Sequence, residues 1–142
     1  MKRLLATLAA ASTFFLAGCG LGTAGGLIPS GQLKGDLADI DLDGANISIG
    51  SKNFTEQVIL GYILEFTLVA AGADVRDMTG IVGSRSTRDA QLAGQVDVAY
   101  EFTGNAWINY LGHEKPIADT REQFEAVRDE DLAANDMIWL EP

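Results

Sequence analysis

The stretch Gly50–Gln57 reads Gly-Ser-Lys-Asn-Phe-Thr-Glu-Gln, and it constrains the fold most because it joins the end of a strand to the start of a helix. A short alternating apolar run precedes it, and a long amphipathic pattern follows it. Asn53 is a favourable N-cap residue, and Glu56, three residues later, is placed to reach back to the N-cap amide. We therefore predict a strand over 46–50 and a helix over 53–71.

The start of this helix is also a favourable place for an anion. The free N–H groups of its first turn lie at the C-terminal edge of a strand, and the helix dipole is positive there. Lys52 adds a full positive charge immediately beside that turn. We interpret this arrangement as one pole of a site for a small carboxylated ligand. The alternative is a solvated turn lysine beside a residue that only caps the helix.

The rest of the chain continues the alternation of helices and strands. The first helix has one broad apolar face at spacings of three and four, formed by Val58, Ile59, Tyr62, Ile63, Phe66, Val69 and Ala70. After Gly72, the pattern predicts a strand over 74–79, a helix over 86–93 capped by Ser86, and a strand over 96–102. It then predicts a short helix over 104–111, a helix over 120–135 and a short strand over 137–140. A capping box of Thr120 and Gln123 opens the helix over 120–135.

This order predicts an α/β fold with a parallel sheet and right-handed crossovers. Ligands of such sheets bind outside the carboxyl ends of the strands. Three loops follow predicted strands, namely Gly50–Asn53, Gly83–Ser86 and Glu101–Asn105. We therefore expect these loops to converge on one rim.

The N-terminal residues predict export and lipidation. A basic start precedes the apolar run Leu4–Leu16, which is too short to span a bilayer and is typical of a secretory signal. The run ends in Leu-Ala-Gly-Cys, which resembles the bacterial lipobox, whose cysteine (here Cys19) is lipidated. We predict a signal peptide over 1–18, a lipidated N-terminus with a flexible tether over 19–44, and a folded part over 45–142. The alternative is a plain signal peptide with an unmodified cysteine.

Composition excludes several classes of function. The formal net charge of −10 disfavours nucleic acid as a partner, because phosphate contacts need a basic face. With one cysteine and one histidine, the 142 residues hold neither an intrachain disulfide nor a zinc site of three or four Cys/His ligands. The sequence contains no Gly-x-Ser-x-Gly elbow and no Walker-type loop. We predict neither an enzyme nor a cofactor.

Four segments carry a resemblance to a known family. They are Ile49–Gln57, Gly83–Arg88, Tyr100–Gly104 and, more weakly, Ile138–Pro142. Together they resemble the glycine betaine, choline and carnitine binding proteins of osmoprotectant ABC transporters. The resemblance covers about Ala45–Pro142, and its most specific part is the Lys-Asn-Phe-Thr-Glu-Gln run.

This resemblance implies a type II periplasmic-binding-protein fold, in which two α/β lobes close over a ligand, with this chain forming the first lobe. It also implies a lipid-anchored protein on the outer face of the cell membrane that delivers its ligand to ABC permease subunits. The family ligands carry a trimethylammonium head, which aromatic faces hold because it cannot donate a hydrogen bond.

The resemblance also implies site residues. The family takes a lysine from the first segment, and an aromatic residue and a threonine from the third; these match Lys52, Tyr100 and Thr103, with Gln57 as a further candidate. The alternatives are a core role for Tyr100 in its strand and a turn hydrogen bond for Thr103. We interpret Trp107 and Tyr110 as packing residues, and His113 as a surface loop residue.

Family members are about twice as long as this chain, which ends where the family fold would cross into the second lobe. The resemblance therefore leaves two alternative functions open. One is a truncated surface lipoprotein that cannot bind ligand, and the other is a binder of a different small zwitterion such as an amino acid.

Overall fold

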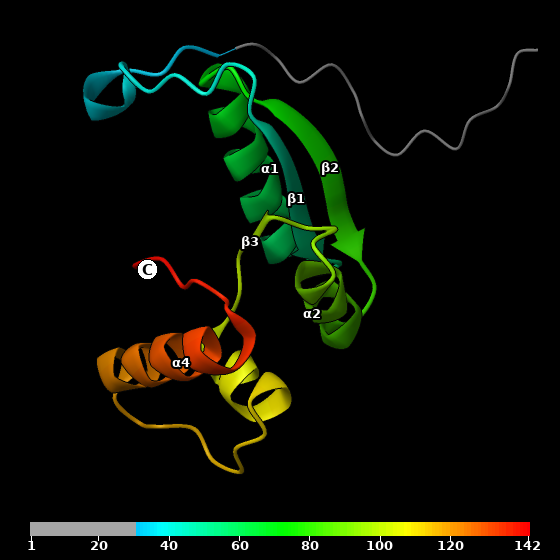
Figure 1. Cartoon of the computed structure of the whole chain (residues 1–142), viewed down its shortest axis with the longest axis vertical. Helices are drawn as coiled ribbons and strands as arrows, with labels where there is room; N and C mark the ends of the chain where they lie inside the picture. The colour runs from blue at the N-terminus through cyan, green and yellow to red at the C-terminus, as the bar shows by residue number, and fades with distance from the viewer. Residues whose placement is uncertain (1–30) are drawn as a thin grey trace, which may run out of the picture.

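The computed structural model describes residues 31–142 (Figure 1). The predicted signal peptide, Cys19 and the tether up to residue 30 lie outside the described residues. The elements are, in order, η1 (Gly35–Leu37), β1 (Asn46–Lys52), α1 (Thr55–Ala70), β2 (Asp74–Ile81), α2 (Ser84–Leu92), β3 (Val98–Ala99), α3 (Thr103–Asn105), the π-helix η2 (Ala106–Tyr110) and α4 (Thr120–Asn135). None of the helices in this part of the chain has the length and apolar character that a membrane span requires.

Three parallel strands form the sheet, in the order β2-β1-β3. The central strand is β1, whose fully buried Ile49 lies opposite Asp77 of β2 and Val98 of β3. Next to it, Gly50 has no room for a side chain, since a Cβ there would lie 2.7 Å from a methyl carbon of Val96. The predicted α/β fold with a parallel sheet is confirmed.

The start of α1 differs from the prediction because β1 runs two residues further. Lys52 still pairs with Ile81 of β2, and the backbone N–H of Asn53 donates to the Ile81 carbonyl at 3.1 Å. Asn53 is therefore held by the strand ladder, and the extended residue Phe54 occupies the N-cap position without a side-chain cap. The predicted capping by Asn53 and Glu56 is wrong.

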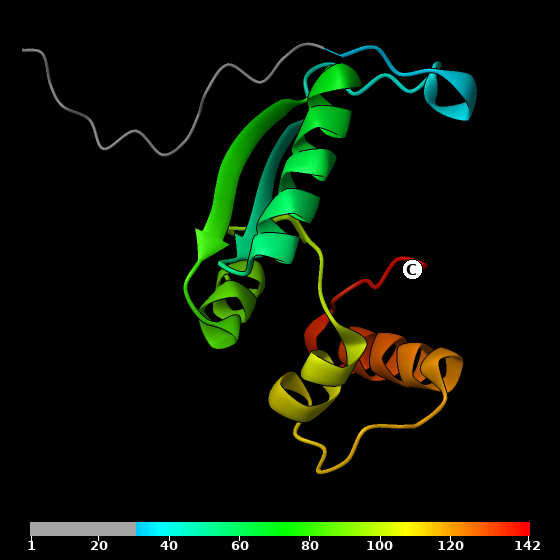
Figure 2. The ribbon, with the colours of Figure 1, turned by 180° about the vertical axis from the view of Figure 1, so that it is seen from behind.

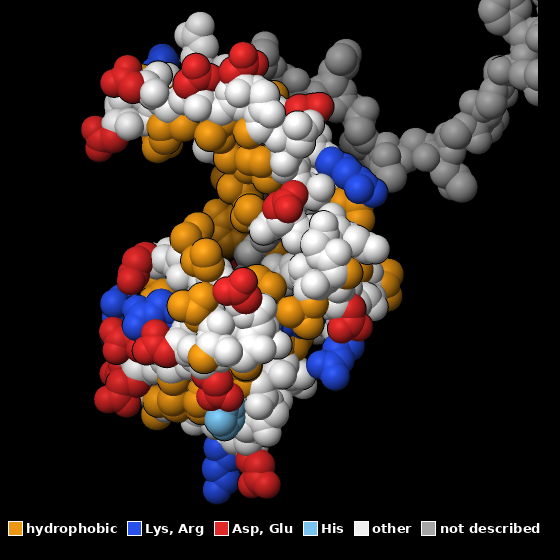
Figure 3. Space-filling model, in the orientation of Figure 1, with side chains coloured by type: hydrophobic (Ala, Val, Ile, Leu, Met, Phe, Trp, Pro, Cys, Tyr) orange, Lys and Arg blue, Asp and Glu red, His pale blue; other side chains and the backbone are white. Residues whose placement is uncertain are grey.

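The face of α1 that meets the sheet is small and polar. Gln57, Gly61 and Glu65, spaced four apart, are its buried residues. A Cβ on Gly61 would lie 2.9 Å from a methyl carbon of Thr79, so the helix lies too close to the sheet for a large side chain there. Of the predicted apolar face, Ile59, Ile63 and Phe66 are 53%, 51% and 42% exposed. Its remaining residues are half-buried, namely Val58, Tyr62, Val69 and Ala70. Figure 3 shows hydrophobic side chains over α1 lining a hollow.

The next two elements differ from the prediction in length: β3 is shorter than predicted, and α2 is longer. Two residues of β3 pair with β1, and the chain then leaves the sheet at Tyr100, so the predicted strand over 96–102 is wrong at both ends. α2 begins at Ser84 instead of Ser86, with Gly83 at the N-cap position. Gly83 has φ 90°, a conformation that glycine adopts without strain.

The C-terminal helix has the predicted extent and a different cap. Asp119, one residue before α4, accepts hydrogen bonds from the backbone N–H groups of Arg121 and Glu122 at 2.9 Å. Thr120 is thus the first helical residue, and the Gln123 side chain instead accepts from the backbone of the preceding loop. The predicted capping box is wrong, since the preceding carboxylate already satisfies the first turn.

The remaining helices lie at the end of the sheet where β1 and β2 stop (Figure 2). The predicted short helix is present as α3 followed by η2. Arg88 of α2 ties this region together through a fully buried ion pair with Asp131 of α4. The Nε1 of Trp139 donates to the same carboxylate at 2.7 Å. Residues 137–140 do not form the predicted strand.

Candidate ligand-binding site

The loops that follow the strands meet, as predicted, at the carboxyl end of the sheet. The Lys52 side chain at the end of β1 pairs with Glu101, which follows β3. The Tyr110 hydroxyl, which donates to Glu101 Oε2, also lies 3.1 Å from the carbonyl oxygen of Ser84, at the start of α2. These two links join the three loops into one rim.

Glu101 is the centre of this rim. Its Oε1 accepts from Lys52 Nζ, from the backbone N–H of Phe102 at 2.7 Å and from Asn105 Nδ2 at 3.2 Å. Its Oε2 accepts from the Tyr110 hydroxyl at 2.6 Å. Four donors therefore satisfy the two carboxylate oxygens.

Lys52 is buried and not solvated. Its side chain is 1% exposed, and its Nζ lies 5.4 Å from the centroid of the Phe102 ring. The alternative of a solvated turn lysine is therefore wrong. A buried ammonium needs a partner, and Glu101, 49 residues away in sequence, supplies it.

The other predicted ligand residues differ in their accessibility. Tyr100 lies one residue beyond β3 and is 42% exposed, so it is not a core residue of the strand. Thr103 begins α3 and is half-buried. Glu101 separates these two residues in the chain, so its contacts fix the loop that carries both. Gln57, in the first turn of α1, is buried, and its Oε1 has no hydrogen-bond partner in residues 31–142.

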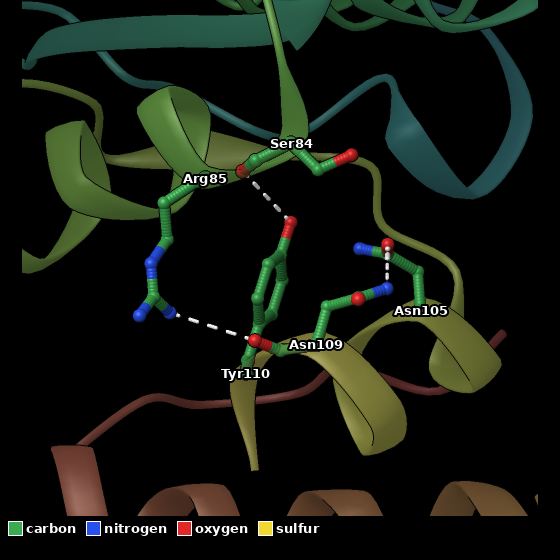
Figure 4. Close-up of a pocket in the computed structure, with 5 residues that line it drawn as sticks. All are labelled: Ser84, Arg85, Asn105, Asn109 and Tyr110. Atoms are coloured by element: carbon green, nitrogen blue, oxygen red, sulfur yellow. Dashed lines mark hydrogen bonds between the residues drawn. The ribbon is translucent and has the colours of Figure 1, made fainter. Parts of the chain in front are cut away.

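A polar cavity of about 320 Å³ opens on the rim (Figure 4). It is lined by Ser84, Arg85, Asn105, Asn109 and Tyr110. Arg85 Nη1 lies 3.5 Å from the carbonyl of Asn109, and Asn109 Nδ2 donates to Asn105 Oδ1 at 2.9 Å. Three of these residues belong to the predicted rim loops, whereas the i, i+4 pair of asparagines gave no signal in the sequence.

Tyr110 is more than the predicted packing residue. Burial, and then its hydrogen bond to Glu101, raises the pKa of its phenol, so the hydroxyl stays protonated and donates to Glu101. Its ring also lies 5.1 Å from the guanidinium carbon of Arg88. Trp107 does pack, stacked on His113 at 3.5 Å, and His113 lies in the predicted loop with Nε2 2.8 Å from Glu130.

Residues 31–142 hold no group of three or more His, Cys, Asp and Glu side chains placed to bind a metal ion. The rim instead combines an exposed aromatic ring, hydroxyl and amide groups, an exposed arginine and one internally paired lysine. This set is suited to a small polar ligand rather than to a metal.

Comparison with known proteins identifies the family of this chain. Residues 45–142 match the family model described as the substrate binding domain of ABC-type glycine betaine transport system. A glycine-betaine-binding protein of Pseudomonas aeruginosa is 38% identical over 96 residues, which cover 68% of this chain and 30% of that protein. The chemotactic signal transduction system substrate-binding protein CosB of Halobacterium salinarum is 32% identical over 88 residues, covering 60% of this chain and 26% of that protein.

Solved structures agree. Apo YehZ from Escherichia coli, 28% identical, superposes with a TM-score of 0.62 over 68% of this chain and 35% of that one. A glycine betaine/carnitine/choline ABC transporter structure, 16% identical, has a TM-score of 0.56 over 68% and 36%, which supports the fold alone.

The chain thus spans about a third of the length of these relatives, and the fold is part of a periplasmic-binding-protein-like domain. From the strand-to-helix rim, the resemblance of its loops and the match over residues 45–142, the chain belongs to the family of substrate-binding domains of ABC-type glycine betaine transport systems.

Proposed function

We propose that this chain captures glycine betaine or a related quaternary ammonium compound for uptake through an ABC permease. The observation that carries the proposal is the loop Tyr100–Asn105, which Glu101 fixes at the carboxyl edge of the sheet with the Tyr100 ring exposed. The family match and the name of the Pseudomonas relative support the choice of ligand.

The chemistry of the rim fits such a ligand. A trimethylammonium group cannot donate hydrogen bonds, and an aromatic face contributes up to about 2 kcal/mol to holding it when water is excluded. Tyr100 offers that face. Thr103 has a hydroxyl for a carboxylate, and Lys52 can meet a carboxylate only by leaving Glu101. Gln57 is buried, and its amide oxygen, which has no hydrogen-bond partner in residues 31–142, would face the cationic head of the ligand.

Because the chain spans about a third of its relatives, it supplies one side of the binding site. Two alternatives follow from this. A truncated lipoprotein would bind no ligand, and an amino-acid binder would prefer a ligand whose ammonium group donates hydrogen bonds. Neither has a supporting observation of its own among the described residues.

We also propose that the protein is exported and anchored through a lipid on Cys19, with residues 19–44 as a tether to the outer face of the membrane. The lipobox-like Leu-Ala-Gly-Cys after an apolar run supports this. Two or more acyl chains would hold the protein durably, since each buried CH₂ contributes about 0.8 kcal/mol. Fatty-acid labelling that is equal in wild type and Cys19→Ala would contradict the anchor.

The ligand assignment is tested on this chain completed by the remaining part of the Pseudomonas relative. Tyr100→Ala should weaken choline and glycine betaine alike, by roughly 10-fold, because it removes a ring face that serves the head group alone. Lys52→Ala should weaken glycine betaine and should not weaken choline, which has no carboxylate and which the charge of Glu101, left unpaired, would attract.

Dissociation constants for both ligands and for an amino acid, measured by calorimetry on folded variants, decide the matter. A completed protein that binds the amino acid and neither osmolyte would overturn the assignment. Equal weakening of both osmolytes by Lys52→Ala would make that lysine structural.

A further inference from the structure

The charge of Lys52 is cancelled inside the rim before any ligand arrives. The lysine is 1% exposed, its partner Glu101 has a side chain 8% exposed, and the two form an ion pair. An ion pair desolvated to this degree presents little net charge to a neighbour, whereas either member alone presents a full one.

Glu101 is held in this role by contacts that do not involve a ligand. Tyr110 and Asn105 both donate to it from the helical segment that follows, and the backbone N–H of Phe102 donates at 2.7 Å. Its position in the chain, between Tyr100 and Thr103, places the cancelling charge within the loop that carries both proposed ligand residues.

We infer that Glu101 is a specificity-determining residue, which makes the rim accept a quaternary ammonium head by neutralising Lys52 and thereby disfavours ligands that carry only a carboxylate. The inference rests on the proposed function for the identity of the cationic ligand. Two other cations lie near the rim and neither contacts Glu101, since Arg88 is paired with Asp131 and Arg85 is exposed, with Nη1 3.5 Å from the carbonyl of Asn109.

The consequence is a reversal of preference when the charge of Glu101 is removed. Glu101→Gln leaves the shape nearly unchanged and exposes the charge of Lys52 to the site. Choline, a cation without a carboxylate, should bind about 10-fold more weakly. The probe 3,3-dimethylbutyrate, which keeps the carboxylate and replaces the trimethylammonium by a tert-butyl group, should bind about 10-fold more tightly, the range of one charge-assisted hydrogen bond.

The experiment is an NMR titration of the full 142-residue chain in detergent micelles, since shift changes report binding even in the millimolar range. Both ligands are titrated into wild type, Glu101→Gln and Tyr110→Phe. The last variant removes one hydrogen bond to Glu101 and no charge, so it should shift both affinities in the same direction. If Glu101→Gln acted only by loosening the loop, it too would change the affinities for both ligands in the same direction. Affinity changes in opposite directions for choline and the carboxylate probe therefore identify a charge effect.

The double variant Lys52→Gln/Glu101→Gln removes both charges and should restore the preference of wild type for choline. If Glu101→Gln alone does not fold, the double variant can still be measured, because replacing both members of a buried ion pair is tolerated better than replacing one. In that case, a double variant that prefers the carboxylate probe overturns the inference.

The outcomes also separate the inference from the proposed function. If wild type binds no choline while Glu101→Gln binds the carboxylate probe more tightly than wild type does, the proposed ligand is wrong and the role of Glu101 stands. If Glu101→Gln does not bind the probe more tightly than wild type, the inference is overturned, whatever choline does.

Discussion

Glu65 is an acidic side chain in an environment that disfavours its charge. It lies on the sheet-facing side of α1, 1% exposed, and its Oε1 has no hydrogen-bond partner in residues 31–142. Burial, reinforced by nearby Asp77, raises the pKa of Glu65 from 4.5 to about 7. The backbone N–H and the hydroxyl of Thr79 both donate to Asp77 Oδ1 at 2.7 Å.

This pKa predicts a stability that falls as pH rises. Between pH 4.5 and 7, the folded state keeps the Glu65 proton that the unfolded chain releases, so the free energy of unfolding decreases over that window. Above pH 7, the free energy of unfolding has lost the full contribution of this shift, on the order of 3 kcal/mol. Glu65→Gln should remove the slope and be the more stable form at pH 8, with little difference at pH 4.

Urea denaturation at several pH values measures this. Glu56→Gln serves as the matched control, because Glu56 is an exposed carboxylate on the opposite face of the same helix. If wild type and Glu65→Gln show the same slope between pH 4.5 and 7, Glu65 is not the group responsible.

At the residue scale, the sequence indicated the rim residues and missed their partners. Lys52 was a candidate from the local strand-to-helix pattern, whereas Tyr100 and Thr103 were candidates through the family resemblance of their segment. Glu101 and Asp131 are recognisable only through ion pairs that span 49 and 43 residues. Asp131 stands in an acidic stretch that is typical of a solvated helix face, and nothing in that stretch shows that Arg88 will bury it.

At the scale of elements, the boundary of α4 gives a direct test of which residue caps it. Asp119→Ala removes the carboxylate that accepts from the Arg121 and Glu122 amides and should destabilise the protein by about 1 kcal/mol. Thr120→Ala, the matched control one residue on, should change stability little, because Thr120 is already helical. Thermal or urea unfolding compares the two, and a larger loss in Thr120→Ala would restore the capping box.

The order of elements was predictable from alternating patterns, whereas their ends and faces depended on pairing between elements. β1 extends beyond its apolar run, because β2 pairs with it as far as Lys52. The face of α1 was assigned from hydrophobic spacing, which assumes that the apolar side meets the sheet. The close approach at Gly61 reverses that assignment, and no single-helix pattern shows how near a sheet will lie.

At the scale of the whole molecule, the described residues leave large apolar side chains uncovered. Ile59 and Ile63 on α1 are about half exposed, and Ile138 and Leu140 near the C-terminus are 74% and 77% exposed. Apolar surface of this kind marks an interaction site or a risk of aggregation. The chain also spans about a third of the length of the relatives it matches.

We therefore predict that the 142-residue chain alone binds glycine betaine weakly, with a dissociation constant above about 10 μM, which corresponds to roughly 7 kcal/mol. One rim contacts one side of the ligand, and its aromatic face remains in water, where a cation–π contact contributes about 0.5–1 kcal/mol instead of about 2. Completing the chain with the remaining part of the Pseudomonas relative should strengthen binding by at least about 100-fold, because a second surface then excludes water and adds contacts. Calorimetry on both forms, with unfolding curves to show that each is folded, makes the comparison. A folded 142-residue chain that binds glycine betaine more tightly than 10 μM would show that the Tyr100–Asn105 rim is sufficient by itself, without contacts from the remaining part of the domain.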